Sequence, residues 1–187
     1  MKAVLMSIKP RWCELIASGK KTVEVRKTRP KLYVPFKVYI YCTKSKDSTF
    51  FTEQVFEGEK GKWAIPYVGN GKVIGEFVCY KIDKIFQCNS GWVQEHACIS
   101  REEYFKYLGL PYNSHFDSKG AYAWHITDLV IYDEPRELGE FLKATKVFPT
   151  LIKDIASNGY RYNEFYYPLT RPPQSWCYVE RSESDGQ

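Results

Sequence analysis

The stretch GKKTVEVR, residues 19–26, decides how the first third of this chain folds. In its last five residues polar and apolar side chains alternate, which is the period of a β-strand with one buried face. The alternation predicts that the two valines face the core. Three polar side chains then share the opposite face, where they can meet a ligand: Thr22, Glu24 and Arg26.

A short helix is predicted directly before this strand, from Pro10 to Ser18. Proline suits the first helical position, because its missing N–H would have no partner there. Trp12, Leu15 and Ile16 follow at helical spacing and form one apolar face. Gly19 then supplies a left-handed end to the helix. The sequence therefore predicts a strand that follows a helix packed on the sheet.

The remaining patterns describe a chain that is mostly β. A capping-box pattern at Ser100–Glu103 starts a second helix that ends near Gly109, and residues 137–142 suit a third, shorter one. Because strands and helices do not alternate as in a βαβ fold, the fold class is α+β, a small barrel flanked by two or three short helices. Further strands are predicted at residues 1–7, 37–42, 72–86 and 120–133, and residues 171–179 are predicted to form a proline-led loop that enters a final strand.

The length of 187 residues predicts one domain, over residues 1–180. Residues 43–71 are polar and longer than most loops, so we expect an insertion there, with partial order or a function as a lid. Residues 181–187 form a polar tail.

Composition argues against a membrane protein, a secreted protein and a metal site. The chain is 44% hydrophobic and 26% charged, and it has no apolar run long enough for a membrane helix and no signal-peptide pattern, so a cytoplasmic protein that does not bind membranes is expected. Six cysteines are scattered without a CxxC pair and are interpreted as free thiols. Cys88, His96 and Cys98 fit known zinc spacings poorly, so neither a metal nor another cofactor is predicted.

Charge and aromatic content permit a nucleic-acid partner without requiring one. Lys and Arg number 27 against 22 Asp and Glu, a net charge of +5. Fifteen tyrosines and five tryptophans raise the aromatic content to 17%. Aromatic side chains beside basic ones can stack on bases and contact phosphates, but the same residues also favour β-strands.

The pattern GxKxxExR, formed by Gly19, Lys21, Glu24 and Arg26, resembles the signature of the ASCH family within the PUA-like superfamily. The flanking segments Lys9-Pro10-x-Trp12 and Tyr122-x-Trp124-x-Ile126 resemble it as well. The resemblance implies a PUA-like barrel whose cleft binds RNA or a modified nucleotide. It also implies that Lys21, Glu24 and Arg26 line that cleft.

The physical reading of these residues allows two interpretations. Glu24 and Arg26 can form a preorganised pair in which Arg26 offers a planar donor fork to phosphate or a base edge, while Lys21 adds a mobile charge. Alternatively, Glu24 and Arg26 are an exposed ion pair, as many charge pairs on strand faces are. The family pattern favours the ligand site.

Catalysis on RNA or nucleosides is the alternative function. Family members that remove the acyl group from N4-acetylcytidine use a lysine, which Lys21 matches, and a threonine, whose position Glu24 occupies here. Thr22 and Glu76 can then replace the missing threonine and the later glutamate. A ribonuclease would use Lys21 and Glu24 on the phosphate and the 2′-hydroxyl. The three histidines are interpreted as structural: His96, His115 and His125.

Several residues outside the motif are added to the predicted binding site, each with a structural alternative. Tyr122 and Trp124 share one strand face and can line either the barrel or the cleft. Trp176 can be a stacking platform or part of a loop packed on the barrel. The complete predicted ligand-binding set is Lys9, Lys21, Thr22, Glu24, Arg26, Glu76, Tyr122, Trp124, Arg171, Gln174 and Trp176.

Overall fold

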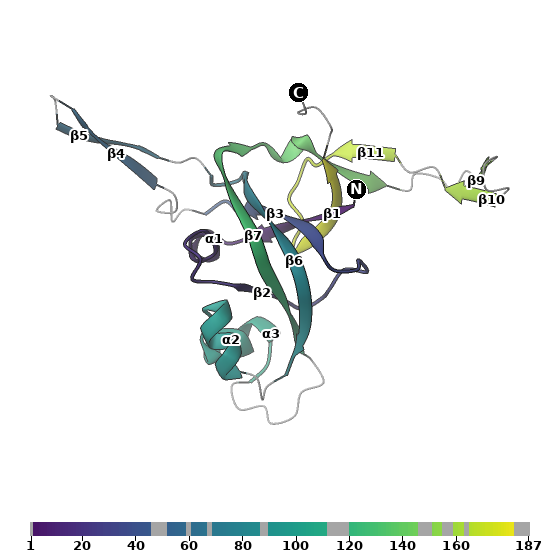
Figure 1. Cartoon of the computed structure of the whole chain (residues 1–187), viewed down its shortest axis with the longest axis horizontal. Helices are drawn as coiled ribbons and strands as arrows, with labels where there is room; N and C mark the ends of the chain where they lie inside the picture. Colours follow the sequence, from purple (N-terminus) through teal and green to yellow (C-terminus); the bar gives the residue numbers. More distant parts are fainter. Residues whose placement is uncertain are drawn as a thin grey trace.

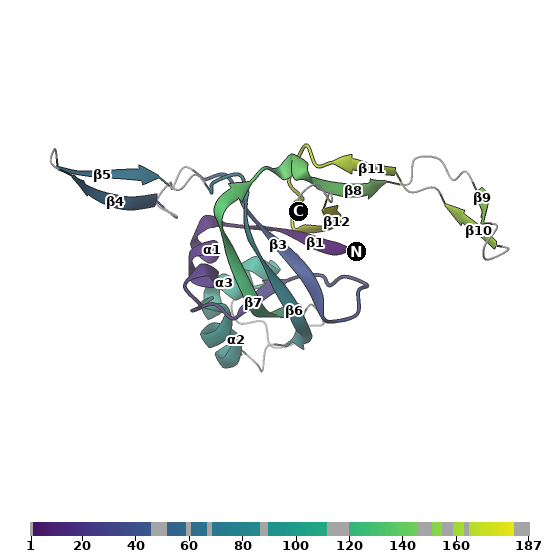
Figure 2. The same cartoon turned by 45° about the horizontal axis from the view of Figure 1, so that its top comes forward.

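The structure is a computed structural model, and it describes residues 2–45, 52–58, 61–66, 69–86, 90–111, 120–145, 151–154, 159–162 and 165–181. Figures 1 and 2 show a curved sheet with the helices gathered at one end. The helices are α1 (Pro10–Ala17), α2 (Ser90–Ala97) and α3 (Arg101–Leu108), with a 3₁₀ turn, η2, at Leu138–Glu140. The strands are β1 (Ala3–Ile8), β2 (Val23–Arg26), β3 (Phe36–Cys42), β4 (Thr52–Gly58), β5 (Gly61–Pro66), β6 (Val73–Ile85), β7 (Ala121–Arg136), β8 (Phe141–Thr145), β9 (Leu151–Asp154), β10 (Gly159–Tyr162), β11 (Phe165–Pro168) and β12 (Trp176–Arg181).

Eight of these strands form one sheet in the order β11-β8-β12-β1-β3-β6-β7-β2. The predicted mostly-β fold with short helices is therefore confirmed, and the predicted small barrel is found as a curved sheet that does not close. Among the described residues the end strands β11 and β2 do not pair with each other, so the sheet stays open. Strand β2 has only four residues and a backbone ladder to β7 alone. Its link to β1 is a side-chain contact, in which Arg26 NH2 donates to the Ser7 carbonyl over 2.8 Å.

Most local predictions agree with the structure. Helix α1 begins with Pro10, and Gly19 after it has a φ of 73°. The helix predicted over 137–142 is reduced to the 3₁₀ turn η2. Helix α2 is not predicted from the sequence, because its segment contains Gly91 and its apolar residues follow the helical period only weakly. Its inward residues Val93 and Ala97 are fully buried, so packing stabilises this helix.

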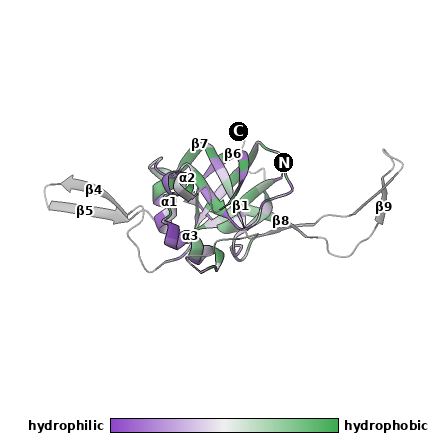
Figure 3. Cartoon of the chain, turned by 90° about the horizontal axis from the view of Figure 1, so that it is seen from below, coloured by the Kyte–Doolittle hydropathy of each residue, from purple (hydrophilic) through white to green (hydrophobic). Residues whose placement is uncertain are grey.

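Two apolar layers lie on the two faces of the β2–β7 ladder. Val23 and Val25 pack with α2 and α3 in one cluster. The larger cluster on the other face is built from β1, α1, β3 and β6, and it includes Trp124. Figure 3 shows hydrophobic and hydrophilic residues alternating along β6 and β7, as expected for strands with two different faces.

The insertion predicted over residues 43–71 falls partly outside the described residues. Within it β4 and β5 pair antiparallel with each other. A function as a lid remains a prediction. Of the predicted tail, residues 182–187 lie outside the described residues, and Arg181 ends β12.

The capping box of α3 provides a test of helix stability. Ser100 Oγ accepts from the backbone N–H of Glu103 over 3.1 Å, and Glu103 Oε2 accepts from the N–H of Ser100 over 3.0 Å. Ser100→Ala should lower the free energy of unfolding by about 1 kcal/mol, measured by urea denaturation. Ser18→Ala, at the exposed end of α1, is the control and should change it by less than about 0.5 kcal/mol. Equal effects of the two variants would show that the box does not stabilise α3.

The same cap makes stability depend on pH. The hydrogen bond from the Ser100 N–H, opposed by partial burial and helped by Arg11, lowers the pKa of Glu103. A carboxyl whose pKa is lower in the folded state stabilises the protein above its unfolded pKa, and this contribution is lost as the pH falls through the folded value. The loss of unfolding free energy between neutral and acidic pH should therefore be smaller in the Glu103→Gln variant, which has no carboxyl to titrate at this position, as urea denaturation at the two pH values measures.

Candidate functional site

A cavity of about 540 Å³ lies between β1, α1, β2 and α3. This volume is within the usual range for small-molecule sites. Five of its lining residues belong to the predicted binding set: Lys9, Lys21, Glu24, Arg26 and Gln174. The other nine were not predicted from the sequence to belong to the site: Ser7, Ile8, Trp12, Val25, Thr43, Ile99, Glu103, Lys106 and Tyr107.

Three charged side chains form the wall of this cavity that belongs to β2 and the turn before it. Lys21, Glu24 and Arg26 are 4%, 6% and 8% exposed. Glu24 lies between the two cations, with Oε1 3.0 Å from Arg26 NH2 and Oε2 3.2 Å from Lys21 Nζ. The interpretation of Glu24 and Arg26 as an exposed surface ion pair is therefore wrong. We call these three residues the buried charge cluster.

The register of β2 explains why these charges are buried. Glu24 pairs with Trp124 and Arg26 with Tyr122 across the antiparallel ladder. Directly opposed residues share one face of a sheet, so Glu24 and Arg26 lie on the face that carries Trp124. That is the face of the larger core cluster, and the valines of β2 face the helices. The predicted alternation is correct, but both faces of the strand are covered.

Backbone carbonyls hold the two cations of the cluster. Lys21 Nζ donates to the carbonyl of Ala97, at the end of α2, over 2.7 Å. Arg26 NH2 donates to Ser7 as described above. Buried charges are tolerated when they are paired and hydrogen-bonded in this way. Because two cations share one carboxylate, the cluster keeps a net charge of +1.

Two polar atoms of the cluster have no hydrogen-bond partner among the described residues. Arg26 Nε lacks an acceptor, and Glu24 Oε2 contacts Lys21 without hydrogen-bond geometry. Both atoms are buried, and both residues line the cavity. Buried polar groups normally have a partner. Two residues of the cavity wall therefore each keep one buried polar atom without a hydrogen-bond partner, a donor on Arg26 and an acceptor on Glu24.

Helix α3 supplies the opposite wall of the cavity. Glu103, Lys106 and Tyr107 follow at i, i+3 and i+4 and so share one helix face. That spacing is the signal that could have identified them, but the sequence does not show that α3 packs opposite β2. Glu103 is bound by Arg11 of α1 over 2.8 Å. Four basic and two acidic side chains line the cavity, so its wall favours an anionic ligand.

Aromatic rings complete the cavity. Trp12 of α1 lies under Lys21, with Nζ 5.0 Å from the ring centroid. Tyr107 lies at the α3 side, and burial raises the pKa of its phenol. Aromatic faces within a basic cavity suit a planar ring with polar edges.

The other predicted ligand residues do not line the cavity. Trp124 is fully buried in the core, and Trp176 packs against it at 5.8 Å between ring centroids. Tyr122 packs against the same cluster. Arg171 and Thr22 are exposed and outside the cavity lining.

Glu76 belongs to a separate polar group on β6. It is hydrogen-bonded to Tyr132 and Lys37. It does not line the cavity. Neither Thr22 nor Glu76 is therefore placed to replace the threonine and glutamate of an amidohydrolase.

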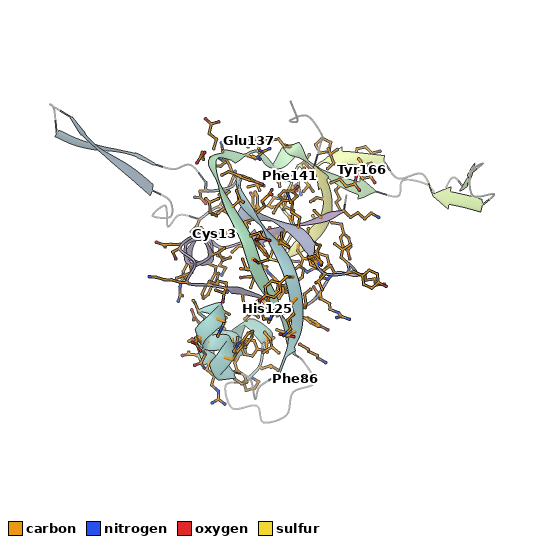
Figure 4. All side chains as sticks on the ribbon, viewed as in Figure 1. Cys13, Phe86, His125, Glu137, Phe141 and Tyr166 are labelled. Atoms are coloured by element: carbon orange, nitrogen blue, oxygen red, sulfur yellow. The ribbon has the colours of Figure 1, made fainter. Side chains whose placement is uncertain are left out.

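The histidines and cysteines lie elsewhere or outside the described residues. His125 on β7 binds Asp83 over 2.8 Å, and Figure 4 shows it apart from Cys13 on α1. His115 and Cys88 lie outside the described residues. Among the residues that the structure describes, no three His, Cys, Asp or Glu side chains are grouped to hold a metal. No described helix is long and apolar enough to cross a membrane.

Solved structures resemble this chain in fold. No curated protein matches it. In fold it is similar to three crystal structures from Zymomonas mobilis. A serine-to-alanine mutant of an ASCH protein is 18% identical, with a TM-score of 0.54, and the match covers 95% of this chain and 88% of that one. The unmutated ASCH protein is 17% identical, with a TM-score of 0.49, covering 95% and 87%. A tyrosine-to-phenylalanine mutant is 19% identical, with a TM-score of 0.49, covering 96% and 91%.

The comparison with family models decides the classification. The ASCH domain model matches residues 6–136. This range includes the whole buried charge cluster and 13 of the 14 residues that line the cavity; Gln174 alone among them lies outside it. Strand β12 also lies outside the matched residues, yet it pairs with β1 in the same sheet. This chain belongs to the ASCH domain family.

Proposed function

We propose that this protein binds RNA or a nucleotide, with one nucleotide held in the cavity beside the buried charge cluster. The observation that carries the proposal is the cavity of about 540 Å³ whose wall contains the buried charge cluster, in which a donor, Arg26 Nε, and an acceptor, Glu24 Oε2, have no hydrogen-bond partner among the described residues. A base edge that carries a carbonyl next to an amino or imino group is complementary to such a pair. The RNA-binding character of the ASCH and PUA-like proteins supports the same assignment.

The other cavity walls support a nucleotide over a neutral ligand. The basic excess of the lining favours a phosphate, and the rim lysines Lys9 and Lys106 are exposed and so can reach one. Trp12 and Tyr107 offer ring faces for the base. The cavity therefore combines basic side chains that can bind a phosphate with aromatic rings that can stack on a base.

A single conservative substitution tests the proposal. Arg26→Lys keeps a cation beside Glu24 but removes the planar fork and its Nε donor. We expect binding of a fluorescein-labelled RNA octamer of random sequence, or of any of the four ribonucleoside 5′-monophosphates, to weaken about tenfold or more, measured by anisotropy and calorimetry. Arg136→Lys, on β7 away from the cavity, is the matched control and should bind as the unchanged protein does.

Two outcomes would contradict the proposal. The first is that the unchanged protein binds none of these probes. The second is that Arg26→Lys and Arg136→Lys bind equally well. Thermal melts of both variants check that a loss of binding is not a loss of folded protein.

Catalysis is the second candidate, favoured by the position of Lys21 Nζ 3.2 Å from Glu24 Oε2 inside the cavity. A paired ammonium and carboxylate can transfer protons to and from a bound substrate. The same protein samples are incubated with N4-acetylcytidine and with end-labelled RNA, and products are separated by chromatography. Unchanged substrates after long incubation with stoichiometric protein would leave binding as the function.

A further inference from the structure

The basic residues of this chain are concentrated in its first quarter. Residues 1–45 contain eleven of the 27 Lys and Arg but two of the 22 Asp and Glu, so this part carries a charge of +9. The remaining residues then carry −4. A protein with a modest net charge of +5 thus has a strongly basic segment, and its densest part leads directly away from the cavity.

That part is the loop at residues 27–35, which joins β2 to β3 (Figure 1). It follows Arg26 without interruption. Three cations of this loop are exposed: Lys27, Arg29 and Lys31. None of the three is paired with a carboxylate among the described residues, whereas Lys21 and Arg26 share Glu24. Their charge is therefore available to an anionic partner.

The loop is fixed to the sheet, so these side chains are presented from a rigid base. Pro30 is buried, and Leu32 packs against the main core cluster. Trp176 Nε1 donates to Thr28 Oγ1 over 3.0 Å, and the N–H of Lys31 donates to the Tyr178 hydroxyl over 2.7 Å. A preorganised loop loses little conformational freedom when a ligand binds.

An aromatic ring follows the three cations on the exposed side of the loop. Tyr33 is 97% exposed, although aromatic side chains are normally buried for most of their surface. Exposed aromatic rings beside cations are the usual means by which proteins bind single strands, because every base has a face to stack. The same loop thus offers cations for phosphates and a ring for a base.

The loop is continuous with the cavity. Lys27 Nζ lies 5.1 Å from the ring centroid of Tyr107, which lines the cavity. On the other side, Gln174 lines the cavity and Trp176, two residues later, holds Thr28. Lys27 therefore lies where the cavity meets the loop, and Arg29, Lys31 and Tyr33 follow it along the chain.

From this arrangement we propose that the loop is a track for a single RNA strand whose one nucleotide occupies the cavity. The inference rests on the proposed function and deepens it, because the partner is then a strand and not a free nucleotide. The strand backbone contacts Lys27, Arg29 and Lys31, and a neighbouring base stacks on Tyr33. Strand length, not the identity of the bound nucleotide, determines how many of these contacts form.

The test compares a short probe with a long one. The short probe is the set of four ribonucleoside 5′-monophosphates, and the long one is the labelled RNA octamer of random sequence. In the triple variant Lys27→Gln, Arg29→Gln, Lys31→Gln, octamer affinity should fall about tenfold or more at 0.1 M salt, while monophosphate affinity stays unchanged. Loss of three phosphate contacts should also reduce the slope of log K against log salt by about 2.

Two controls separate the loop from general charge and general aromatic effects. Lys72→Gln, Lys81→Gln, Lys143→Gln removes the same charge elsewhere and should leave octamer binding nearly unchanged. Tyr33→Ala should weaken the octamer about fivefold or more, and Tyr33→Phe should restore it. Tyr167→Ala, at another exposed tyrosine, should have no effect.

The outcomes distinguish this inference from the function on which it rests. Equal octamer binding by the two triple variants would overturn the track and leave the cavity site intact. A parallel loss of octamer and monophosphate binding in the loop variant would also overturn it, because the loop would then act on the cavity itself. If the unchanged protein binds neither probe, the proposed function fails first.

Discussion

Glu24→Gln is expected to lower the free energy of unfolding by about 3 kcal/mol or more, one of the two largest effects that we predict. The substitution keeps the shape of the side chain but leaves two buried cations, Lys21 and Arg26, without their shared carboxylate. Removing one partner of a buried ion pair strands an uncompensated charge and typically costs about 3–5 kcal/mol. Urea denaturation at neutral pH measures the change.

The control for this prediction is Glu14→Gln, on the exposed side of α1, which should change the free energy of unfolding by less than about 0.5 kcal/mol. A loss below about 1 kcal/mol for Glu24→Gln would contradict the prediction, since the charges would then be well hydrated.

A second variant separates stability from function at the same positions. Replacing all three members of the cluster together, as Lys21→Met, Glu24→Leu, Arg26→Met, leaves no unpaired charge, and such replacements are often neutral for stability. The folded triple variant should not bind the RNA octamer. The cluster is then retained for its ligand and not for the fold.

Trp124→Ala should lower the free energy of unfolding by about 3–5 kcal/mol, the other large effect. The side chain is fully buried in the main core cluster. Its ring meets Phe36 edge to face at 5.7 Å between centroids and Trp176 at 5.8 Å. Truncation removes these contacts and leaves a cavity that the surrounding strands cannot fill.

Trp92→Ala is the matched control for this substitution, because Trp92 on α2 is 36% exposed. Trp92→Ala should lower the free energy of unfolding by clearly less than Trp124→Ala does, by about 1 kcal/mol. If Trp124→Ala instead left the stability near that of the unchanged protein and abolished ligand binding, Trp124 would belong to the binding site, which was one of the two alternatives that its sequence pattern allowed.

Local signals in the sequence were sufficient for several elements. Pro10 and Gly19 mark the two ends of α1, and Ser100 with Glu103 marks the start of α3. These residues act through their own backbone geometry and through hydrogen bonds to neighbours three residues away, so no distant contact is needed to predict them. Helix α2 has no such signal and depends on packing.

The barrel was predicted from strand content, and strand content does not decide closure. Whether the two end strands meet depends on their lengths and on the tilt of every strand between them. Strand β2 ends after four residues, and side chains make its contact with β1. Whether the sheet closes is therefore a property of the assembled sheet and not of any single strand.

The sequence by itself determined which residues of the central motif share a face: the alternation of 22–26 sets Glu24 and Arg26 together, since successive side chains of a strand point to opposite sides. Only the tertiary structure decided which side that is. The pairing of Glu24 with Trp124 turns the charged face toward the core, and α3, some 80 residues away in the chain, closes the cavity over it. The alternation of polar and apolar residues is set by neighbours in the chain, whereas the register of a strand and the burial of its faces arise from contacts between distant segments.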